Sequence, residues 1–471
     1  MLAGGRKRRQ YLDEIDLLVI GGGTGGYTAA IRGTQLGLSA AIVEADKIGG
    51  TCLHRGCIPT KTWLHSAEVL TQTRNAATFG VTVSEPSLDY AVMRERQRTV
   101  VDALYKGIVG AVQKHKIEII EGHATIASPT DVTVGDRRLK AKSIVVATGS
   151  RPKGLPGLEP DGERIITSDE ILESESAPKS IAIIGGGAIG CEFASFFIDA
   201  GAEVTLIEVM PELVPLEDAD AGKTLGKALA ARGVNVMTSA KVLADRTRSY
   251  DGVVEVPVEH EGAEKQVKAE VLLLAVGREA VTDGLGLEST KVEIDRGWIK
   301  VDDAYRTAEP TIFAVGDAIG GYLLAHVAGA EGFLAAEAAA GKDIEKLDYT
   351  RVPRVTYSNP QVASVGLTVE EAKERGLNAK AQRFSLKYNA MALIRDETEG
   401  FAKVVFDADS RDLLGVHLVG AHVADIVSEA ALARFLQASA WELGTSIHPH
   451  PSMSEVLGEA AQLSAEISIY W

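Results

Sequence analysis

The chain has 471 residues, 45% of them hydrophobic and 24% charged, a composition typical of a globular protein with about three domains. Lys and Arg number 49 and Asp and Glu number 65, which gives a formal net charge of −16. Binding to nucleic acid needs clustered basic charge, so this composition argues against a nucleic-acid partner.

The N-terminal residues 1–10 are basic but are followed by no apolar segment, which predicts a solvated tail rather than a secretory signal. The chain contains no run of 18 apolar residues, so we expect no membrane-spanning helix. Three cysteines are too few for a secreted disulfide framework. We therefore expect a cytoplasmic protein that does not associate with membranes.

The first predicted nucleotide-binding element begins with an apolar run at residues 15–20, which predicts a strand. A glycine-rich turn and a stretch of small residues, predicted to be helical, follow this run. A second predicted strand, residues 39–43, ends at an acidic residue. This order matches the dinucleotide-binding fingerprint, whose positions are Gly21, Gly23, Gly26 and Glu44.

Each position of this fingerprint has a physical role. The first glycine allows a tight turn, the second lets the backbone approach a pyrophosphate, and the third lets the helix pack closely on the strand. The N–H groups at the helix N-terminus and their partial positive charge attract the phosphates. The acidic residue accepts hydrogen bonds from ribose hydroxyls.

Cys52 and Cys57 follow this element and are five residues apart. On a regular helix their α-carbons would be about 8 Å apart, whereas a disulfide needs less than about 7 Å. Gly56 and Pro59 predict an irregular helix start that would allow closure. A strained disulfide is easily reduced, which favours a redox role. Metal binding is disfavoured because no second ligand pair matches the two cysteines.

The fingerprint recurs at an offset of 164 residues. A predicted strand at residues 180–184 leads into a second glycine turn, and a strand at residues 202–207 ends at an acid. In both copies the acid lies 23 positions after the first glycine. The second set of positions is Gly185, Gly187, Gly190 and Glu208. Two such copies and a dithiol predict two bound dinucleotides and an electron relay.

Glu208 also predicts which nicotinamide cofactor is used. A carboxylate here would repel the 2′-phosphate of NADPH, and residues 209–215 contain no Arg or Lys to attract it. We therefore expect NADH to be preferred over NADPH. The alternative is that Glu208 is only a solvated residue at a strand end.

Residues 351–471 differ in character from the rest of the chain. Short strands are predicted at residues 402–406 and 413–419, separated by a turn at 407–410. A helix of small residues is predicted at 425–440. This segment is an α+β unit without a nucleotide motif.

As a set, these motifs resemble the flavin disulfide reductases, and the resemblance extends from about residue 15 to residue 463. Within that family the chain is most similar to the members that oxidise dihydrolipoyl groups. Besides both glycine turns, the residues that carry the resemblance are the dithiol segment 49–61, Ala-Thr-Gly at 147–149, Val-Gly-Arg at 276–278, Ile-Phe-Ala-Val-Gly-Asp at 312–317 and His-Pro-His-Pro-Ser-Met-Ser-Glu at 448–455.

The resemblance implies an α/β fold with two Rossmann-like dinucleotide-binding domains and a C-terminal α+β dimerisation domain. The expected divisions are residues 11–150 for an FAD-binding domain, 151–279 for an NAD-binding domain, 280–350 for a central segment that completes the FAD side, and 351–471 for the dimer interface.

The resemblance also implies roles for individual side chains. Cys57 would lie against the flavin, Cys52 would exchange with the substrate, and Lys61 would pair with Glu192. FAD binding is implied for Gly21, Gly23, Gly26, Glu44, Gly50, Thr51, Lys61, Thr148, Gly149, Asp317, Ala325 and His326, and NAD binding for Gly185, Gly187, Gly190, Glu208 and Gly277. Two alternatives remain open: Lys61 as an exposed helix residue, and Asp317 as a helix N-cap. Cys191 is expected to pack beneath the second turn.

His450 is the predicted general base, because a dithiol substrate must lose a proton to react, and Glu455 could hold its imidazole in place. The rival interpretation is a capping box from Ser452 to Glu455. A cis bond before Pro451 is plausible. By resemblance, the pair would reach the dithiol of a second subunit, so we expect a homodimer.

The implied reaction is oxidation of protein-bound dihydrolipoyl groups with NAD⁺. The partner would be a lipoyl-bearing acyltransferase or a glycine-cleavage carrier protein, because this chain carries no lipoyl-like segment. A glutathione-type enzyme would have Arg in place of Glu208, and a mercuric-type enzyme would need cysteines beyond Cys191. The alternative is that the protein is a binding module rather than primarily an enzyme, that is, a subunit that docks into a multienzyme complex and has only secondary redox activity.

Overall fold

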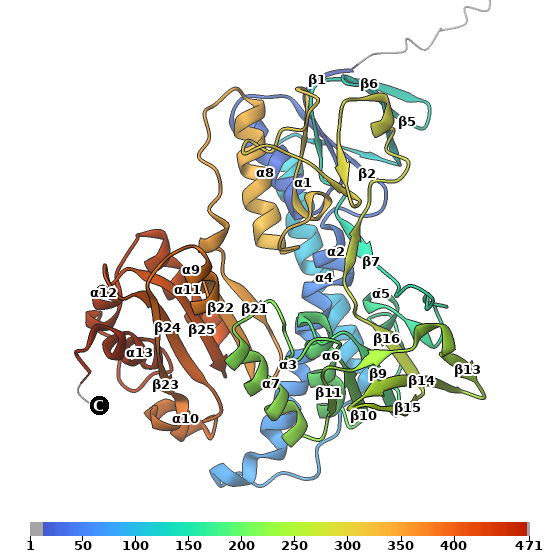
Figure 1. The fold of residues 1–471 in the computed structure, drawn as a ribbon. Helices are drawn as coiled ribbons and strands as arrows, with labels where there is room; N and C mark the ends of the chain where they lie inside the picture. The colour runs from blue at the N-terminus through green and yellow to red at the C-terminus, as the bar shows by residue number, and fades with distance from the viewer. Residues whose placement is uncertain (1–12, 469–471) are drawn as a thin grey trace, which may run out of the picture. The chain divides into compact units, whose positions relative to one another are not determined.

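The structure is a computed structural model that describes residues 13–468 (Figure 1). The predicted basic tail, residues 1–10, lies outside these residues. The chain divides into two compact units. Unit 1 contains the chain up to residue 59 together with residues 95–152 and 278–347, and unit 2 contains residues 60–94, 153–277 and 348–471.

The structure divides into two units, whereas four segments were expected from sequence, and one stretch of the first expected segment falls in the other unit. Residues 60–94 group with unit 2, whereas the sequence placed them in a domain spanning 11–150. The reason is the long helix α3 (Cys57–Arg74), which carries the chain out of unit 1. Residues 153–277 and 348–471 form separate sheets within unit 2. The finer boundaries stay a prediction.

The sheet of unit 1 has the strand order β3-β2-β1-β6-β5-β4, and β20 also pairs with β6. The apolar run becomes β1, which is parallel to β2 and β6. Leu17 and Val19 belong to one hydrophobic cluster and Leu18 and Ile20 to another, so β1 is buried on both faces. The strands are β1 (Asp13–Ile20), β2 (Ala40–Glu44), β3 (Glu118–Glu121), β4 (Ala124–Ser128), β5 (Asp131–Val134), β6 (Arg137–Val146) and β20 (Ile312–Ala314).

Helices α1 (Thr24–Gln35) and α8 (Ala325–Ala339) lie side by side in unit 1 (Figure 1). Their close approach depends on two glycines, because a β-carbon at Gly332 would lie 2.2 Å from the carbonyl oxygen of Gly25. Small residues thereby bring the segment after β20 against the first glycine turn. The other α-helices and strands that include unit 1 residues, besides the start of α3, are α2 (Gly50–Arg55), α4 (Tyr90–Lys114), β7 (Ser150–Pro152), β17 (Arg278–Ala280), β18 (Ile294–Asp295) and β19 (Trp298–Ile299).

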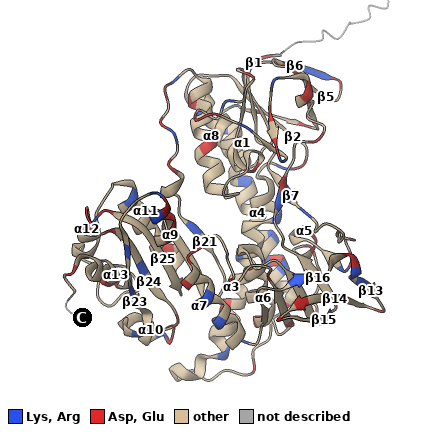
Figure 2. Ribbon diagram, viewed as in Figure 1, with Lys and Arg blue, Asp and Glu red and all other residues tan. Residues whose placement is uncertain are grey.

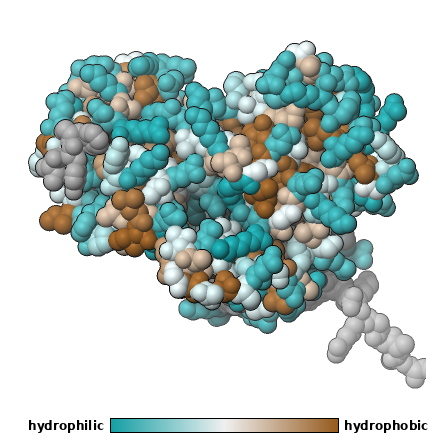
Figure 3. Space-filling model, turned by 90° about the horizontal axis from the view of Figure 1, so that it is seen from below, coloured by the Kyte–Doolittle hydropathy of each residue, from teal (hydrophilic) through white to brown (hydrophobic). Residues whose placement is uncertain are grey.

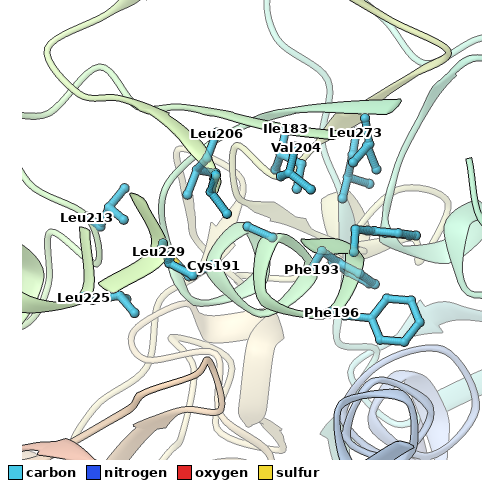
Figure 4. Packing of buried hydrophobic residues seen from close by; sticks show 14 of the residues in the cluster. Ile183, Cys191, Phe193, Phe196, Val204, Leu206, Leu213, Leu225, Leu229 and Leu273 are labelled. Atoms are coloured by element: carbon cyan, nitrogen blue, oxygen red, sulfur yellow. The ribbon is translucent and has the colours of Figure 1, made fainter. Parts of the chain in front are cut away.

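The first sheet of unit 2 is parallel, in the order β11-β10-β9-β16-β8. Ile181 and Ile183 of the central strand β9 face a cluster that includes Phe193 and Phe196 (Figure 4). Ala182 and Ile184 face the opposite cluster. The elements are β8 (Ile165–Ile166), α5 (Ser168–Ile171), β9 (Ser180–Ile184), α6 (Ala188–Asp199), β10 (Glu203–Ile207), α7 (Ala219–Ala231), β11 (Asn235–Met237) and β16 (Val271–Leu274).

A small antiparallel sheet of unit 2 supports the opposite cluster. Val254, Val256 and Val258 of its strand β14 are buried there together with Leu272 and Leu274 of β16. The strands of this sheet are β12 (Lys241–Val242), β13 (Arg248–Tyr250), β14 (Val253–His260) and β15 (Ala263–Ala269).

The C-terminal sheet is antiparallel, in the order β21-β22-β25-β24-β23. The predicted turn after β24 is confirmed, because Asp407 Oδ1 accepts hydrogen bonds from the N–H groups of Asp409 and Ser410. The elements are β21 (Arg354–Thr356), β22 (Gln361–Gly366), α9 (Val369–Glu374), β23 (Ala379–Ser385), α10 (Ala390–Arg395), β24 (Phe401–Asp407), β25 (Leu413–Gly420), α11 (Val423–Phe435), α12 (Ala440–Thr445) and α13 (Glu455–Ala465).

The single helix predicted at residues 425–440 is wrong. Helix α11 ends at Phe435, and Gln437 has a left-handed backbone with φ of 57°. A new helix, α12, then begins behind a capping box between Ser439 and Glu442. The capping-box sequence is a start signal that indicated the break.

Charged residues of both signs are interspersed along the described part of the chain (Figure 2). Among the described residues, no helix combines the length and apolarity that crossing a membrane requires.

Candidate functional site

The first glycine turn connects β1 to α1 in unit 1. Gly21 has a left-handed backbone (φ 101°), and a β-carbon there would lie 2.3 Å from the carbonyl oxygen of Ala147. A β-carbon at Gly26 would lie 1.9 Å from the carbonyl oxygen of Gly21. Glu44, at the end of β2, accepts a 2.6 Å hydrogen bond from Gly22 N–H. The predicted acid therefore lies directly against the turn.

The element carrying the cysteines starts beside this turn. A β-carbon at Gly50, the first residue of α2, would lie 2.7 Å from the α-carbon of Gly23, the N-cap of α1. Gly49 N–H also donates a 2.8 Å hydrogen bond to Gly22 O. Cys52, and Thr51 before it, thus lie in the first turns of a short helix anchored to the first glycine turn.

The predicted helix irregularity between the cysteines is confirmed. Helix α2 ends at Arg55, Gly56 has a non-helical backbone, and Cys57 is the first residue of α3. A β-carbon at Gly56 would lie 3.0 Å from Thr51 O and 3.3 Å from the α-carbon of Cys52. A side chain at residue 56 would crowd this bend between the two cysteines.

The second glycine turn, in unit 2, repeats the first. Gly185 has φ of 109°, and a β-carbon there would lie 2.3 Å from Ala275 O. A β-carbon at Gly190 would lie 1.9 Å from Gly185 O. Glu208 accepts hydrogen bonds from Gly186 N–H (2.6 Å) and Met210 N–H (2.7 Å). Cys191 is buried beneath the turn as expected, and its Sγ donates to Gly186 O.

Both turns fit dinucleotides. Gly187, the N-cap of α6, has no atom within 4 Å of where a β-carbon would stand, and the same point at Gly23 has only Gly50 Cα at 3.9 Å. Neither helix receives a side-chain hydrogen bond at its N-cap. The backbone of each turn is therefore open where a pyrophosphate would approach, and the acid lies within reach of a ribose.

Asp317 lies inside a 3₁₀ turn, Gly316–Ile319, whose N-cap is Val315, so the helix-cap interpretation does not hold. Its Oδ2 accepts a hydrogen bond from Ser150 Oγ. Arg278 donates to Ser150 Oγ and to Ser150 O, both at 2.7 Å. Ser150 and Arg278 thus position Asp317. The sequence predicted no role for either residue, although Arg278 is the last residue of the Val-Gly-Arg motif.

The remaining candidates occupy defined turns in their own units. Thr148 Oγ1 donates to Val281 O (2.6 Å), and Gly149 O accepts from Val281 N–H. Gly277 has φ of 113° and accepts from Lys153 N–H. Ala325 and His326 begin α8. Buried Glu331, further along α8, accepts from Gly316 N–H at 2.7 Å.

Lys61 and Glu192 form the expected ion pair in unit 2. Lys61 Nζ lies 2.9 Å and 2.7 Å from the two carboxylate oxygens, and Glu192 is only 4% exposed. The alternative of Lys61 as an exposed helix residue does not hold, because its side chain is 32% exposed and paired with a buried carboxylate. Tyr357 N–H also donates to Glu192 Oε1, a contact across 165 residues that no sequence periodicity reveals.

His450 and Glu455 lie close together at the start of α13. His450 Nδ1 is 2.8 Å from Glu455 Oε1, while Glu455 Oε2 accepts a 2.7 Å hydrogen bond from Ser452 N–H. One carboxylate therefore contacts the histidine and accepts from Ser452 N–H. The expected capping box does not form, because the N-cap of α13 is Ser454 and makes no side-chain cap hydrogen bond. The role of His450 as a base stays a prediction. The His450–Pro451 bond is cis. Asn389, missed from sequence, donates to Ser452 O and anchors the turn.

A second histidine–glutamate pair joins the residues just before this turn to α11. His448 Nε2 is 2.8 Å from Glu429 Oε1 of α11, and the His448 side chain is 10% exposed. A β-carbon at Gly458 would lie 2.7 Å from His448 Nδ1, so the imidazole packs directly on α13. The hydrogen bond to Glu429 raises the pKa of His448 above its usual value.

This raised pKa predicts a pH-dependent contribution to stability. Because folding favours the protonated imidazole, the contribution is complete below the unfolded-state pKa of about 6.5 and is lost as the pH rises through the folded-state pKa. The melting temperature of wild type should therefore exceed that of His448→Gln most at acidic pH. A difference that stays constant or grows with pH would contradict this. In a Glu429→Gln background the pH-dependent difference should vanish.

No group of three or more His, Cys, Asp or Glu side chains within residues 13–468 is arranged to hold a metal ion.

Comparison with known families gives two matches that together cover most of the chain. Residues 15–332 match the family described as pyridine nucleotide-disulphide oxidoreductase. Residues 352–461 match the dimerisation domain of the same family. The first match contains both glycine turns and both cysteines, and the second contains His450 and Glu455.

Curated relatives are similar over nearly their whole length. The chain is 45% identical over 461 residues to a dihydrolipoyl dehydrogenase of Bacillus subtilis, covering 95% of this chain and 97% of that one. It is 40% identical to a dihydrolipoyl dehydrogenase of Zymomonas mobilis, with the same coverage.

Solved structures show the same fold. LpdA of Mycobacterium tuberculosis matches with a TM-score of 0.86 and 26% identity, covering 95% of this chain and 99% of that one. The flavoprotein disulfide reductase RclA of Escherichia coli matches with a TM-score of 0.83 and 26% identity, covering 96% and 99%.

Proposed function

Because the chain belongs to the pyridine nucleotide-disulphide oxidoreductase family, we propose that it oxidises protein-bound dihydrolipoyl groups to lipoyl groups with NAD⁺ as acceptor. One observation carries the proposal: two matching acid–glycine turns occur with a cysteine pair whose first member, Cys52, lies in a helix that starts at the first turn. Curated relatives that share the whole length bear the name dihydrolipoyl dehydrogenase, which supports this substrate.

The first turn would hold FAD and the second NAD. Glu44 and Glu208 would accept hydrogen bonds from the riboses, and Asp317, fixed by Ser150, would bind the ribityl chain. When bound, FAD accepts an electron pair from the dithiol and passes it to NAD⁺ as hydride. Lys61 would supply a fixed positive charge, held by Glu192.

Cys52 and Cys57 would carry out the thiol–disulfide exchange. A thiolate of the dihydrolipoyl group attacks Cys52 Sγ of the Cys52–Cys57 disulfide and expels the thiolate of Cys57. The second substrate thiol then attacks the mixed disulfide, which releases the lipoyl group and leaves Cys52 reduced. Two electrons and two protons leave the substrate, and the electron pair resides on the enzyme dithiol.

His450 would take the proton from the substrate thiol, since the thiolate and not the thiol is the nucleophile. Glu455 contacts Nδ1 and stabilises the protonated ring, which leaves Nε2 to face the substrate. The His450 side chain is 74% exposed in the single chain, so it is open to a partner.

The dimerisation domain makes a homodimer the working unit. His450 would act on the dithiol of the other subunit. The exposed apolar side chains of α11, α12 and the segment that follows would be covered by the second copy; they include Leu432, Phe435, Leu436, Trp441 and Ile447. Figure 3 shows one face of the molecule, on which apolar side chains gather in patches among hydrophilic ones.

The lipoyl group would come from a separate protein, as in the E3 component of a 2-oxo acid dehydrogenase or glycine-cleavage complex. The partner is then a lipoyl-bearing acyltransferase or a glycine-cleavage carrier protein. Action in the cytoplasm is part of this proposal.

The test is NADH formation by the purified protein with dihydrolipoamide and NAD⁺. A yellow protein that turns over this pair and also a lipoylated carrier domain would support the proposal. Glutathione disulfide with NADPH is the competing substrate pair. Turnover of that pair, together with inactivity toward dihydrolipoamide, would contradict the proposal.

The cofactor preference can be tested through Glu208. Glu208→Arg removes a carboxylate that repels a 2′-phosphate and adds a guanidinium that pairs with it. We expect the ratio of kcat/KM for NADPH to that for NADH to rise by about tenfold or more. Glu203→Arg, an exposed change at the first residue of β10, the strand that Glu208 directly follows, is the matched control and should leave the ratio unchanged. An unchanged ratio in Glu208→Arg would mean that Glu208 does not lie at the ribose.

A further inference from the structure

Tyr357 contacts both members of the Lys61–Glu192 pair. Its backbone N–H donates a 2.9 Å hydrogen bond to Glu192 Oε1. Its ring centroid lies 4.8 Å from Lys61 Nζ. The ammonium of Lys61 therefore contacts both a carboxylate and an aromatic ring, and all three residues belong to unit 2.

The backbone around Tyr357 is fixed independently of its ring. Tyr357 directly follows β21, which pairs with β22 through Thr356 and Val362. Two residues later, Asn359 N–H donates a 3.1 Å hydrogen bond to Ser195 Oγ. Since Glu192 and Ser195 are three residues apart on α6, the segment after β21 lies along one face of that helix. Removing the ring should leave this segment in place.

The Lys61–Glu192 ion pair needs neighbouring groups that hold both side chains in position. Glu192 is almost fully buried, and a buried carboxylate is tolerated only when its oxygens are paired. Lys61 has a flexible stem and a side chain that is 32% exposed, so its ammonium has other orientations available. An aromatic face attracts a cation over its centre and restricts those orientations.

We propose that Tyr357 is a positioning residue for Lys61: its ring holds the ammonium in place while its N–H fixes the carboxylate that neutralises it. The inference rests on the proposed function, in which the positive charge of Lys61 serves the bound flavin. A fixed positive charge beside a redox group favours the reduced, more negative form of that group. Loss of the ring should therefore lower the flavin midpoint potential.

The test is a double-mutant cycle in the full-length protein as isolated, with the variants Tyr357→Ala, Lys61→Gln and their combination. Tyr357→Ala should lower the midpoint potential in the same direction as Lys61→Gln, and the double variant should lie no lower than Lys61→Gln alone. Tyr357→Phe, which keeps the ring, should restore the wild-type potential. Additive shifts, or a wild-type potential in Tyr357→Ala, would overturn the proposal.

A second measurement does not depend on flavin and separates this inference from the proposed function. Acylation of Lys61 by an amine reagent, followed by mass spectrometry, should be several-fold faster in Tyr357→Ala and in Tyr357→Leu than in wild type and Tyr357→Phe. Lys106, an exposed lysine of α4, is the internal control and should react equally in all four proteins. Equal Lys61 labelling in all four would refute the positioning role even if the enzyme oxidises dihydrolipoamide.

Discussion

Cys52→Ser and Cys57→Ser are each expected to abolish dihydrolipoamide turnover, because either change removes the disulfide that the substrate thiolate attacks. The two variants should differ in colour. Cys57 is proposed to lie against the flavin, so only Cys52→Ser should keep the long-wavelength absorbance of a thiolate in contact with flavin. Absorbance spectra and NADH formation measure both effects.

The third cysteine provides the control for these variants. Cys191 is fully buried and donates its thiol proton to a backbone carbonyl, and burial raises the pKa of this thiol. Cys191→Ala should keep most of the activity. If Cys57→Ser kept the long-wavelength band and Cys52→Ser lost it, the two assigned roles would be reversed.

His450→Ala is expected to reduce dihydrolipoamide oxidation by about 10²-fold or more, since the substrate thiol then lacks its base. FAD binding and reduction of the flavin by NADH should remain, because neither uses this histidine. His65 offers a matched control, as its side chain is also 74% exposed. His65→Ala should have near wild-type turnover.

Mixed dimers of His450→Ala and Cys52→Ser chains test whether the base acts across the interface. Such a dimer has one site with an intact cysteine pair from one chain and an intact His450 from the other. That site should regain activity while both parent homodimers are inactive. If the mixed dimers stay inactive although they fold and bind FAD, the base is not supplied by the partner subunit.

The strands that lead into the glycine turns could be read from sequence because each is an apolar run that a glycine turn follows. In the second fingerprint this strand was predicted at residues 180–184, and β9 has those bounds. The strand expected at residues 202–207 begins one residue later, as β10. Such strands are buried on both faces, which leaves a continuous apolar signal that turns interrupt clearly.

Contacts between distant parts of the chain left no such signal. Tyr357 contacts Glu192 through its backbone, and His448, between α12 and α13, contacts Glu429 of α11, so no spacing in the sequence predicts either contact. The helix expected at residues 425–440 failed for another reason. Its small residues continue through the left-handed turn at Gln437, and only the capping box at Ser439 indicates the break. The Lys61–Glu192 pair was expected from resemblance to a family and from no pattern in the sequence.

Anaerobic titration of the purified homodimer with dihydrolipoamide, followed at the flavin absorbance, tests the central claim most directly. The claim is that electrons pass from a dithiol through Cys52 and Cys57 to the flavin and then to NAD⁺. It predicts that dihydrolipoamide bleaches the flavin band without NADH and that added NAD⁺ restores it. A flavin band that NADH bleaches but dihydrolipoamide leaves unchanged would contradict the claim.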